Sequence, residues 1–236
     1  MHKLSERMLM NVSLIPKGFC VADIGCDHGF VSIYLIENKL AKHVIAMDVA
    51  KGPLDRAKEH IMNAGLTDSI ETRLSDGVTG LELLGDKLEA EVLLMAGIGG
   101  HLAVKLVKDN ISKCRGASYI ILQPQSDLDF VRNSMYELGF TIDMEDMVFE
   151  DGKYYTSMRF INCSFKEQLS EAQAMYGPVL LANKNKVLLD YLYYKKDRYE
   201  DIKSKLHVAA AEKNSERIAE LKHDLEIIDK CLEIFG

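Results

Sequence analysis

The fold is decided by residues 21–30, which read VADIGCDHGF. A short apolar run ends at Asp23 and Ile24, glycines follow at Gly25 and Gly29, and the apolar residues after them have helical spacing. This order predicts a buried strand, a tight turn and a helix. Glycine suits such a turn because a backbone without Cβ adopts positive φ and lets a ligand approach closely. A tight turn without any ligand is the alternative interpretation.

Strands and helices alternate on both sides of this turn. Apolar runs predict strands at residues 19–25, 43–49, 70–76, 90–97, 118–124, 140–150 and 153–161. Segments with helical spacing lie between them, at residues 34–40, 52–65, 101–111 and 128–139. Such alternation is typical of an α/β fold with a parallel sheet.

The last two strands are separated by Asp151 and Gly152, a pair that favours a hairpin turn. We therefore predict five parallel strands followed by an antiparallel hairpin. This is the Rossmann-like order of class I S-adenosylmethionine (SAM) dependent methyltransferases, whereas a dinucleotide-binding sheet normally continues with another strand and helix.

The chain has 236 residues, enough for one α/β domain and a smaller appendage. Residues 1–165 carry the strands, and from residue 166 to 236 charged residues alternate with apolar ones at helical spacing. We expect a SAM-binding domain over 1–165 and a helical, coiled-coil-like accessory domain over 166–236. Pro178 is expected to open a helix there, with a turn near residues 213–215.

Composition narrows the class of protein. Apolar residues make up 47% and no run is long enough to span a membrane, so a cytoplasmic protein is expected. The five cysteines form no CxxC pair, which gives no sign of a zinc or redox site. The net charge is −7, so contact with nucleic acid requires a local basic region, and residues 183–205 carry a modest basic excess.

Acidic residues end the next two strands. Asp48 stands at the end of the second strand, where a carboxylate accepts hydrogen bonds from the ribose hydroxyls of an adenosine-containing cofactor. That pairing alone does not separate NAD from SAM, but Asp76 and Gly77 close the third strand where SAM enzymes contact adenine. The predicted cofactor-binding residues are Asp23, Gly25, Gly29, Asp48, Asp76, Gly77, Met95 and Gly97.

The fourth strand ends in residues 95–100, which read MAGIGG. Enzymes that methylate exocyclic base amines commonly carry an Asn/Asp-Pro-Pro-aromatic cluster at this place, and its absence argues against that chemistry. The glycines, Gly99 included, leave room for a flat base. A glycine-rich helix entry is the alternative.

Five motifs occur in order: ADIGCDHG, SDG, MAGIGG, ILQPQ and DGKYY, followed by the charged helical tail. Together they resemble the bacterial TrmK family of tRNA (adenine-N1) methyltransferases over essentially the whole chain. The resemblance implies SAM as cofactor, tRNA as partner and 1-methyladenosine at position 22 of tRNA as product.

Methyl transfer to adenine N1 needs alignment more than a strong base, because neutral adenine keeps a free lone pair on N1. Asp27 and His28, on the first loop, are the candidates for proton transfer, although a histidine here also suits helix capping or packing. Cys26 and His28 alone are too few ligands for a zinc site, so no metal is expected.

Several polar side chains are candidates for binding the substrate. Gln123 and Gln125 end the fifth strand, where amides read a base edge or simply bond the strand end. Arg7 precedes the first strand and is a candidate for contact with a phosphate or with the SAM carboxylate. The alternative is a charged residue on an exposed helix face. The full predicted set is Arg7, Gly99, Gln123, Gln125, Tyr154, Lys195 and Arg198.

Two other functions stay open at this point. The chain also suits a class I methyltransferase that acts on a small molecule or protein, or a non-catalytic SAM-fold module that binds RNA. Lysines and tyrosines interleave in residues 191–199. This pattern suits contact with phosphates together with stacking of tyrosine rings on bases. The alternative is a row of packed tyrosines beneath a solvent-exposed helix face. A monomer is favoured.

Overall fold

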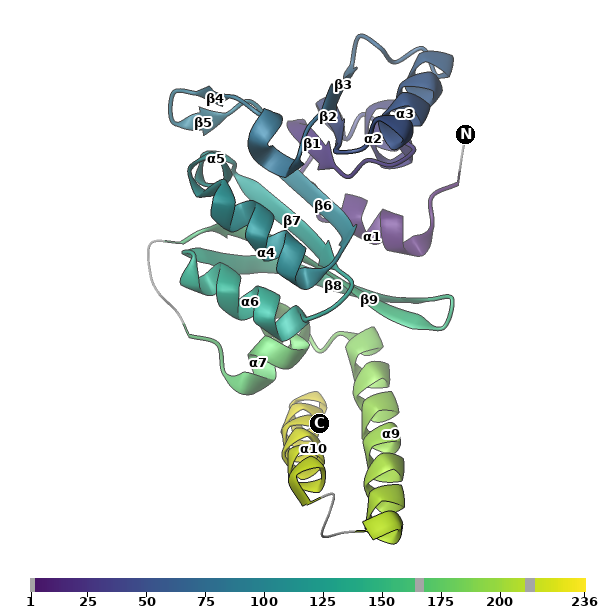
Figure 1. Cartoon of the computed structure of the whole chain (residues 1–236), viewed down its shortest axis with the longest axis vertical. Helices are drawn as coiled ribbons and strands as arrows, with labels where there is room; N and C mark the ends of the chain where they lie inside the picture. The colour runs from purple at the N-terminus through teal and green to yellow at the C-terminus, as the bar shows by residue number, and fades with distance from the viewer. Residues whose placement is uncertain (1–2, 164–167, 211–214) are drawn as a thin grey trace. The chain divides into compact units, whose positions relative to one another are not determined.

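A computed structural model describes residues 3–163, 168–210 and 215–236 (Figure 1). The chain divides into two compact units, Met1–Gln168 and Leu169–Gly236.

The first unit is built on a seven-stranded sheet with the order β3-β2-β1-β6-β7-β9-β8. β1, β2, β3, β6 and β7 pair in parallel, and β9 is antiparallel to both β7 and β8. The prediction of a Rossmann-like sheet that ends in a hairpin is confirmed. The strands are β1 Phe19–Ile24, β2 Ala41–Asp48, β3 Ile70–Leu74, β6 Val92–Ile98, β7 Tyr119–Pro124, β8 Phe140–Glu150 and β9 Lys153–Asn162.

The hairpin turn has the backbone that its sequence predicts. Glu150 pairs with Lys153, and the two residues between them, Asp151 and Gly152, have φ values of 49° and 76°. Two positive φ angles in a two-residue loop match the right-handed twist of the flanking strands, which fixes the register of β8 against β9.

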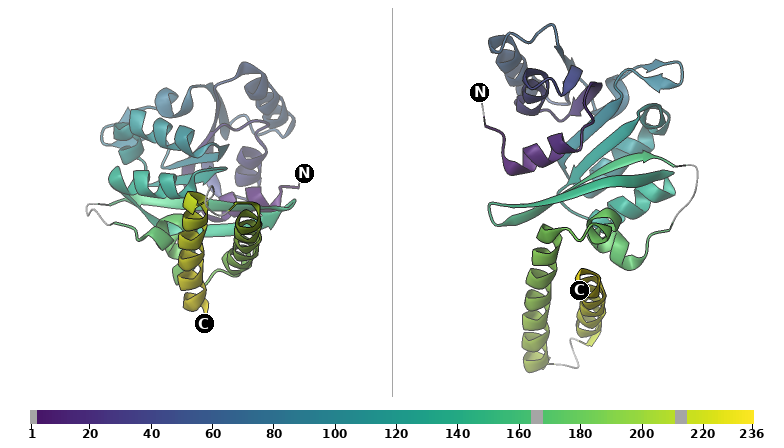
Figure 2. Two further views of the ribbon diagram at one scale, coloured as in Figure 1. Left: turned by 60° about the horizontal axis from the view of Figure 1, so that its bottom comes forward. Right: turned by 180° about the vertical axis from the view of Figure 1, so that it is seen from behind.

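Helices cover both faces of the sheet (Figures 1 and 2). One face carries α1 to α3, and the other carries α4 and α6, which contact each other. The helices are α1 Glu6–Ser13, α2 Phe30–Glu37, α3 Lys51–Asn63, α4 Gly100–Asp109, α5 Ile111–Gly116 and α6 Leu128–Glu137. The sequence did not predict the short elements between β3 and β6: a 3-10 helix at Gly77–Gly80 and the two-residue strands β4 Leu83–Leu84 and β5 Lys87–Leu88.

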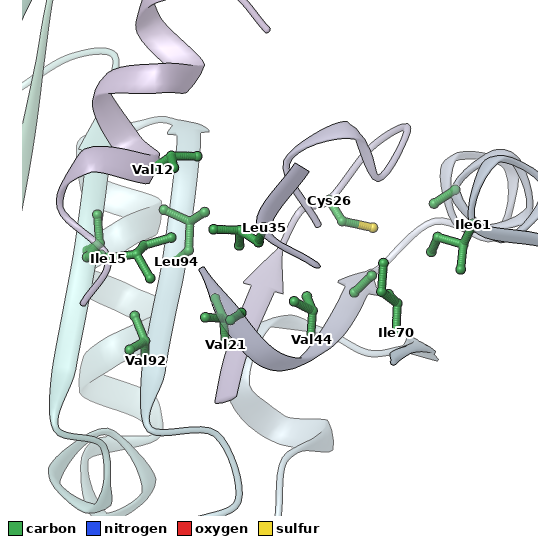
Figure 3. Packing of buried hydrophobic residues seen from close by; sticks show 14 of the residues in the cluster. Val12, Ile15, Val21, Cys26, Leu35, Val44, Ile61, Ile70, Val92 and Leu94 are labelled. Atoms are coloured by element: carbon green, nitrogen blue, oxygen red, sulfur yellow. The ribbon is translucent and has the colours of Figure 1, made fainter. Parts of the chain in front are cut away.

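The core under α1 to α3 joins strand residues such as Val21 and Leu94 to Val12 of α1 and Leu35 of α2 (Figure 3). These side chains are at most 7% exposed. Burial of each contributes roughly 1.5–3 kcal/mol, so α1 is held chiefly by its apolar face.

The hairpin also holds α1 at both ends. At the start of the helix, the Glu6 N–H donates to Oε1 of Glu150 over 2.6 Å. At its end, Nη1 of Arg159 donates to the carbonyl of Leu14 over 3.0 Å. The position of α1 therefore depends on strands more than a hundred residues away in the sequence.

On the opposite face a buried ion pair joins α6 to β8. Nε of Arg132 lies 2.9 Å from Oε1 of Glu145, and the two side chains are 1% and 0% exposed. Removing one partner of such a pair costs about 3–5 kcal/mol because the other charge stays buried.

The second unit is helical, with α7 Glu171–Tyr176, α8 Pro178–Ala182, α9 Lys186–Ala210 and α10 Ser215–Phe235. Pro178 opens α8, as predicted. Apolar side chains of α9 and α10 are buried, among them Leu188, Leu192, Ile218, Leu221, Leu225 and Ile228. The turn expected near residues 213–215 falls largely on 211–214, outside the described residues. In the described parts of both units, every helix is too short or too polar to cross a membrane.

Candidate functional site

A pocket of about 270 Å³ lies at the carboxyl ends of β1, β6 and β7, beside α1 and the start of α2. Eight of the predicted site residues line it: Arg7, Asp23, Gly25, Asp27, His28, Gly97, Gln123 and Gln125. Its other walls are Met8, Asn11, Cys26, Phe30, Val31, Leu94 and Ala96. The fold thus gathers residues from four separate parts of the sequence.

Gly25 gives the pocket an open floor. Its φ is 78°, and a Cβ placed on it would meet no atom within 4 Å. The N–H groups of Gly25 and Cys26 both donate to the carbonyl of Met47, over 2.8 and 2.9 Å. The turn is therefore fixed against β2 while the space beside it stays free for a ligand.

Asp23 is a buried carboxylate in the wall of this pocket. It is 6% exposed, and Oδ2 accepts a 2.6 Å hydrogen bond from Oγ of Ser32. Burial raises the pKa of Asp23 to about 6, against the opposing effect of the Ser32 hydrogen bonds. A cationic group bound beside Asp23 would favour its charged form.

The next strand ends continue along the same edge of the sheet. Oδ1 of Asp48 accepts from the Ala50 N–H over 2.8 Å, and the carbonyl of Asp48 accepts from the Ser75 N–H over 2.9 Å. Asp76 and Gly77 follow at once on β3. These three predicted residues are not among the walls of the pocket and lie further along the same edge of the sheet, toward β3.

The backbone at Gly97 is held by the buried side-chain amide of Gln123. Oε1 of Gln123 accepts from the Gly97 N–H over 3.1 Å, and Gln123 is fully buried. Gly97 has φ of 74°, and a Cβ there would lie 3.7 Å from Nε2 of Gln125. The amide of Gln123 thus bonds the strand end, while the exposed Gln125 keeps its side chain beside Gly97.

His28 combines packing with an unused ring nitrogen. Its ring stacks on Phe30, with centroids 5.4 Å apart and planes at 6°. Nδ1 is buried and finds no hydrogen-bond partner among the described residues. Nε2 lies 3.8 Å from Oδ1 of Asp27, an exposed carboxylate that is also 3.8 Å from Arg56.

Four more predicted residues of the first unit lie elsewhere. A Cβ on Gly29 would come 3.2 Å from that of Ala57, so this glycine lets α2 pack closely on α3. Met95 is fully buried and Gly99 caps α4, and neither lines the pocket. Tyr154 packs on Phe149 near the hairpin turn, with ring centroids 4.6 Å apart.

Lys195 and Arg198 belong to the second unit and have different surroundings. Nζ of Lys195 lies 4.9–5.6 Å from the rings of Tyr176, Tyr191 and Tyr199. Such cation–π contacts stabilise the packing of the unit. Arg198 is exposed, and Nη1 donates to the hydroxyl of Tyr194 over 2.7 Å.

Asn11 is a wall residue that the sequence reasoning missed. It lies on α1, is 2% exposed, and its Oδ1 is buried without a hydrogen-bond partner among the described residues. The available signal was an asparagine one helical turn after Arg7, between Met10 and Val12, which are also buried. The described residues contain no group of three or more His, Cys, Asp or Glu placed to hold a metal ion.

Comparison with known proteins identifies similar chains. A family model described as "TrmK: tRNA (adenine(22)-N(1))-methyltransferase" matches residues 21–230. A curated tRNA (adenine(22)-N(1))-methyltransferase of Bacillus subtilis is 28% identical over 239 residues, covering 98% of each chain.

Two solved structures share the fold over nearly the full length. The B. subtilis m1A22 tRNA methyltransferase TrmK is 27% identical with a TM-score of 0.81, covering 99% of each chain. A putative tRNA (m1A22) methyltransferase of Streptococcus pneumoniae, solved in complex with S-adenosyl-L-methionine, is 25% identical with a TM-score of 0.81. It is matched over 100% of its length and 99% of this chain.

Proposed function

Because the chain belongs to the TrmK family of tRNA (adenine(22)-N(1))-methyltransferases, we propose that the pocket beside Gly25 is where it methylates N1 of an adenine in tRNA. The enzyme uses SAM, as the relative solved with this cofactor indicates. The observation that carries the assignment is the open, positive-φ turn at Gly25, placed between Asp23 and the strand end at Asp48.

The residues present fit SAM. Gly25 leaves a space that a Cβ would narrow, and Asp48 stands at the next strand end, where ribose hydroxyls find an acceptor. Asp76 and Gly77, after the following strand, would then contact the adenine. When bound, SAM supplies a methyl group on a positively charged sulfur, which makes that carbon electrophilic.

The protein's contribution to the reaction is alignment. The lone pair of adenine N1 forms the new N–C bond while the C–S bond breaks and its electrons stay on sulfur, so no proton has to leave first. Gln123 fixes the backbone of Gly97, and the missing side chain there leaves room for the base. Holding the two reactants in line supplies most of the acceleration in such a case.

Positive charge develops on the adenine as the bond forms. Asp27 is a carboxylate on the pocket wall, and Nδ1 of His28 has no hydrogen-bond partner among the described residues. We assign Asp27 to stabilising the charge and His28 to accepting a proton from the exocyclic amine afterwards. Both roles assist the reaction without being essential to bond formation.

The tRNA contact is extended by the second unit. Arg198, Tyr193 and Tyr194 are exposed on α9 and offer a cation and two rings for phosphate and base, whereas the Lys195 ammonium is engaged by its tyrosines. Since tRNA is the substrate class, we place the enzyme in the cytoplasm.

The decisive experiment is to incubate the purified chain with labelled SAM and tRNA, digest the tRNA and separate its nucleosides. We expect label in 1-methyladenosine and none in N6-methyladenosine, because the amine-positioning cluster is absent at residues 95–100. A tRNA in which adenine 22 is replaced by guanine is the control and should stay unlabelled. Label in N6-methyladenosine would overturn the proposed chemistry, and no label at all would favour a small-molecule, protein or non-catalytic role.

A further inference from the structure

Two aromatic rings of the first unit are exposed to solvent on α4 and α6, which lie side by side (Figure 1). The rings of His101 and Phe130 have centroids 4.1 Å apart and planes tilted by 34°. The side chain of His101 is 72% exposed, and Phe130 is 37% exposed. Aromatic pairs in folded proteins usually bury most of their area, so this pair keeps ring surface available for another molecule.

The pair is connected to the pocket by two segments of chain that run together. Gly97 and Gln125 line the pocket, and each lies a few residues before one of the rings. The Gln125 N–H donates to the carbonyl of Ile98 over 2.8 Å. A Cβ on Gly100 would collide with the carbonyl of Ser126, so the two backbones approach closely there. The two rings therefore stand beside the pocket, on the side of Gln125.

Asp127 holds His101 by one edge of its ring. Its backbone has φ of 56°, a left-handed conformation that aspartate adopts more readily than most residues. Its Oδ2 accepts from Oγ of Ser126 over 2.7 Å and lies 4.0 Å from Nε2 of His101. Because the pair is built on a tight junction between two helices, little ordering is needed when a ligand binds to it.

The charge around the pair favours a base over a phosphate as its ligand. The carboxylates of Asp127 and Asp129 are exposed next to Phe130 in the sequence. Lys105, one turn after His101, is paired with Asp109. Two carboxylates repel a phosphate, whereas the face of a base stacks on an aromatic ring without needing a cation.

The proposed reaction creates a need for such a surface. Enzymes that act on a base take it out of its stack, so the neighbouring bases lose a stacking partner. Proteins that bind unstacked RNA bases replace that partner with aromatic side chains. Gly97 leaves room for the target adenine at the pocket, so a base next to it in the strand comes to the side where the two rings stand.

We propose that His101 and Phe130 form a stacking platform for the base of a nucleotide adjacent to the target adenine in tRNA. The inference rests on the proposed function, since it names further residues that recognise the same substrate. The two side chains are positioning residues: they hold the unstacked strand so that the adenine stays in the pocket.

The first test is the kcat/KM of tRNA methylation in four variants of the full chain. His101→Ala and Phe130→Leu remove a ring and should lower kcat/KM by about 5- to 150-fold, the range for loss of one stacked base. His101→Phe and Phe130→Tyr keep a ring and should stay close to the wild-type value. Calorimetry should show an unchanged affinity for S-adenosylhomocysteine in all four variants.

Leu84→Ala is the matched control. Leu84 is an apolar side chain that is 66% exposed, and its short sheet packs against Gly116, just before β7 begins at Tyr119. The pocket lies at the other end of β7, so this variant should methylate tRNA at the wild-type rate. His101→Ala should melt at the wild-type temperature, because substitution of an exposed side chain changes stability little.

A second test observes the stacked base directly. In two tRNAs, 2-aminopurine replaces the nucleotide before or the nucleotide after adenine 22, and its fluorescence is quenched when it stacks. With wild-type protein and S-adenosylhomocysteine, one of the two positions should stay quenched. His101→Ala should raise the fluorescence at that position, and His101→Phe should restore the quenching.

Three results would overturn the platform. They are wild-type kcat/KM in both His101→Ala and Phe130→Leu, equal fluorescence with wild-type protein and His101→Ala at both positions, and a His101→Phe variant as impaired as His101→Ala. The last result would mean that a ring nitrogen of His101 acts and not its face.

The fluorescence measurement also separates this inference from the proposed function. A wild-type protein that forms no 1-methyladenosine, yet quenches the analogue through His101, would support the platform and contradict the proposed function. Failure of the wild-type protein to bind tRNA would overturn both.

Discussion

Ser32, in the first turns of α2, donates a 2.6 Å hydrogen bond to the carboxylate of Asp23 at the end of β1. The carboxylate is nevertheless destabilised, because burial outweighs this bond and raises the pKa of Asp23 to about 6. An unfolded aspartate titrates near pH 4. The folded protein therefore binds this proton more tightly than the unfolded chain does, and the stability linked to it is full below about pH 4 and lost as the pH rises through 6.

We predict that Asp23→Asn removes this pH dependence. Asparagine can still accept from Ser32 but does not ionise, so the variant should gain stability relative to the wild type between pH 4 and pH 7. The gain corresponds to a shift of about two pKa units, on the order of 3 kcal/mol. Urea unfolding at several pH values measures it, with the exposed Asp68→Asn as control. If the free energy of unfolding depended on pH in the same way for Asp23→Asn and the wild type, the raised pKa of Asp23 would be contradicted.

Enlarging Gly97 should block the base without preventing cofactor binding. A methyl group there meets only ordinary contact at Gln125, so Gly97→Ala should cost chiefly the roughly 1–2 kcal/mol of a positive φ. Gly97→Leu adds the same strain and fills the space, and its tRNA methylation should fall at least about 100-fold further. Single-turnover methylation and calorimetry with S-adenosylhomocysteine provide the comparison. Similar rates for the two variants would show that the base enters elsewhere.

Asp48→Ala should weaken S-adenosylhomocysteine binding by about 1–3 kcal/mol, the cost of leaving ribose hydroxyls unbonded at a polar site. It also removes the hydrogen bond to the Ala50 N–H at the start of α3. Asp48→Asn keeps an oxygen acceptor for one of these donors, so its loss of affinity should be smaller. Calorimetry on both variants tests the ribose role, which an unchanged affinity in Asp48→Ala would exclude.

Two neighbouring cations of α9 should respond differently to substitution. Arg198→Ala should lower tRNA affinity and reduce the salt dependence of binding by about one phosphate contact, because Arg198 is exposed. Lys195→Ala should instead lower the stability of the second unit, because Lys195 contacts three tyrosine rings. Filter binding over a salt series, together with thermal unfolding, separates the effects. If Lys195→Ala lost tRNA affinity while the second unit kept its full stability, Lys195 would contact the RNA as predicted from the sequence.

The strand pattern was predictable because β1, β6 and β7 are largely buried apolar runs bounded by turn residues, and β8 alternates buried and more exposed positions. Asp151 and Gly152 also specify their turn locally, since the two-residue turn requires positive φ at both positions and these residue types adopt it. The elements between Gly77 and Leu88 were not predictable. The strands there are two residues long and form no period, so they depend on tertiary contacts such as the ion pair between Arg73 and Glu89.

The candidate site was predictable where strand ends define it and not where packing does. Gly25 and Asp48 follow apolar runs, and parallel strands bring their ends to one edge of the sheet. Asn11 reaches the pocket because α1 packs on the core and on β8, whose contacting residue Glu150 is 144 positions from Glu6. The local signal, its position one helical turn after Arg7, does not show where α1 packs, so the sequence left Asn11 unassigned.

The buried pair of Arg132 and Glu145 restricts how this chain can drift in evolution. A change at either position alone leaves an unpaired charge buried in the interior. A joint change to two well-fitting apolar residues leaves the stability nearly unchanged. Replacing the ion pair by an apolar pair one residue at a time passes through an intermediate that is destabilised by about 3–5 kcal/mol, a large part of the total stability of a domain. The two positions should therefore change together in related sequences or stay as they are.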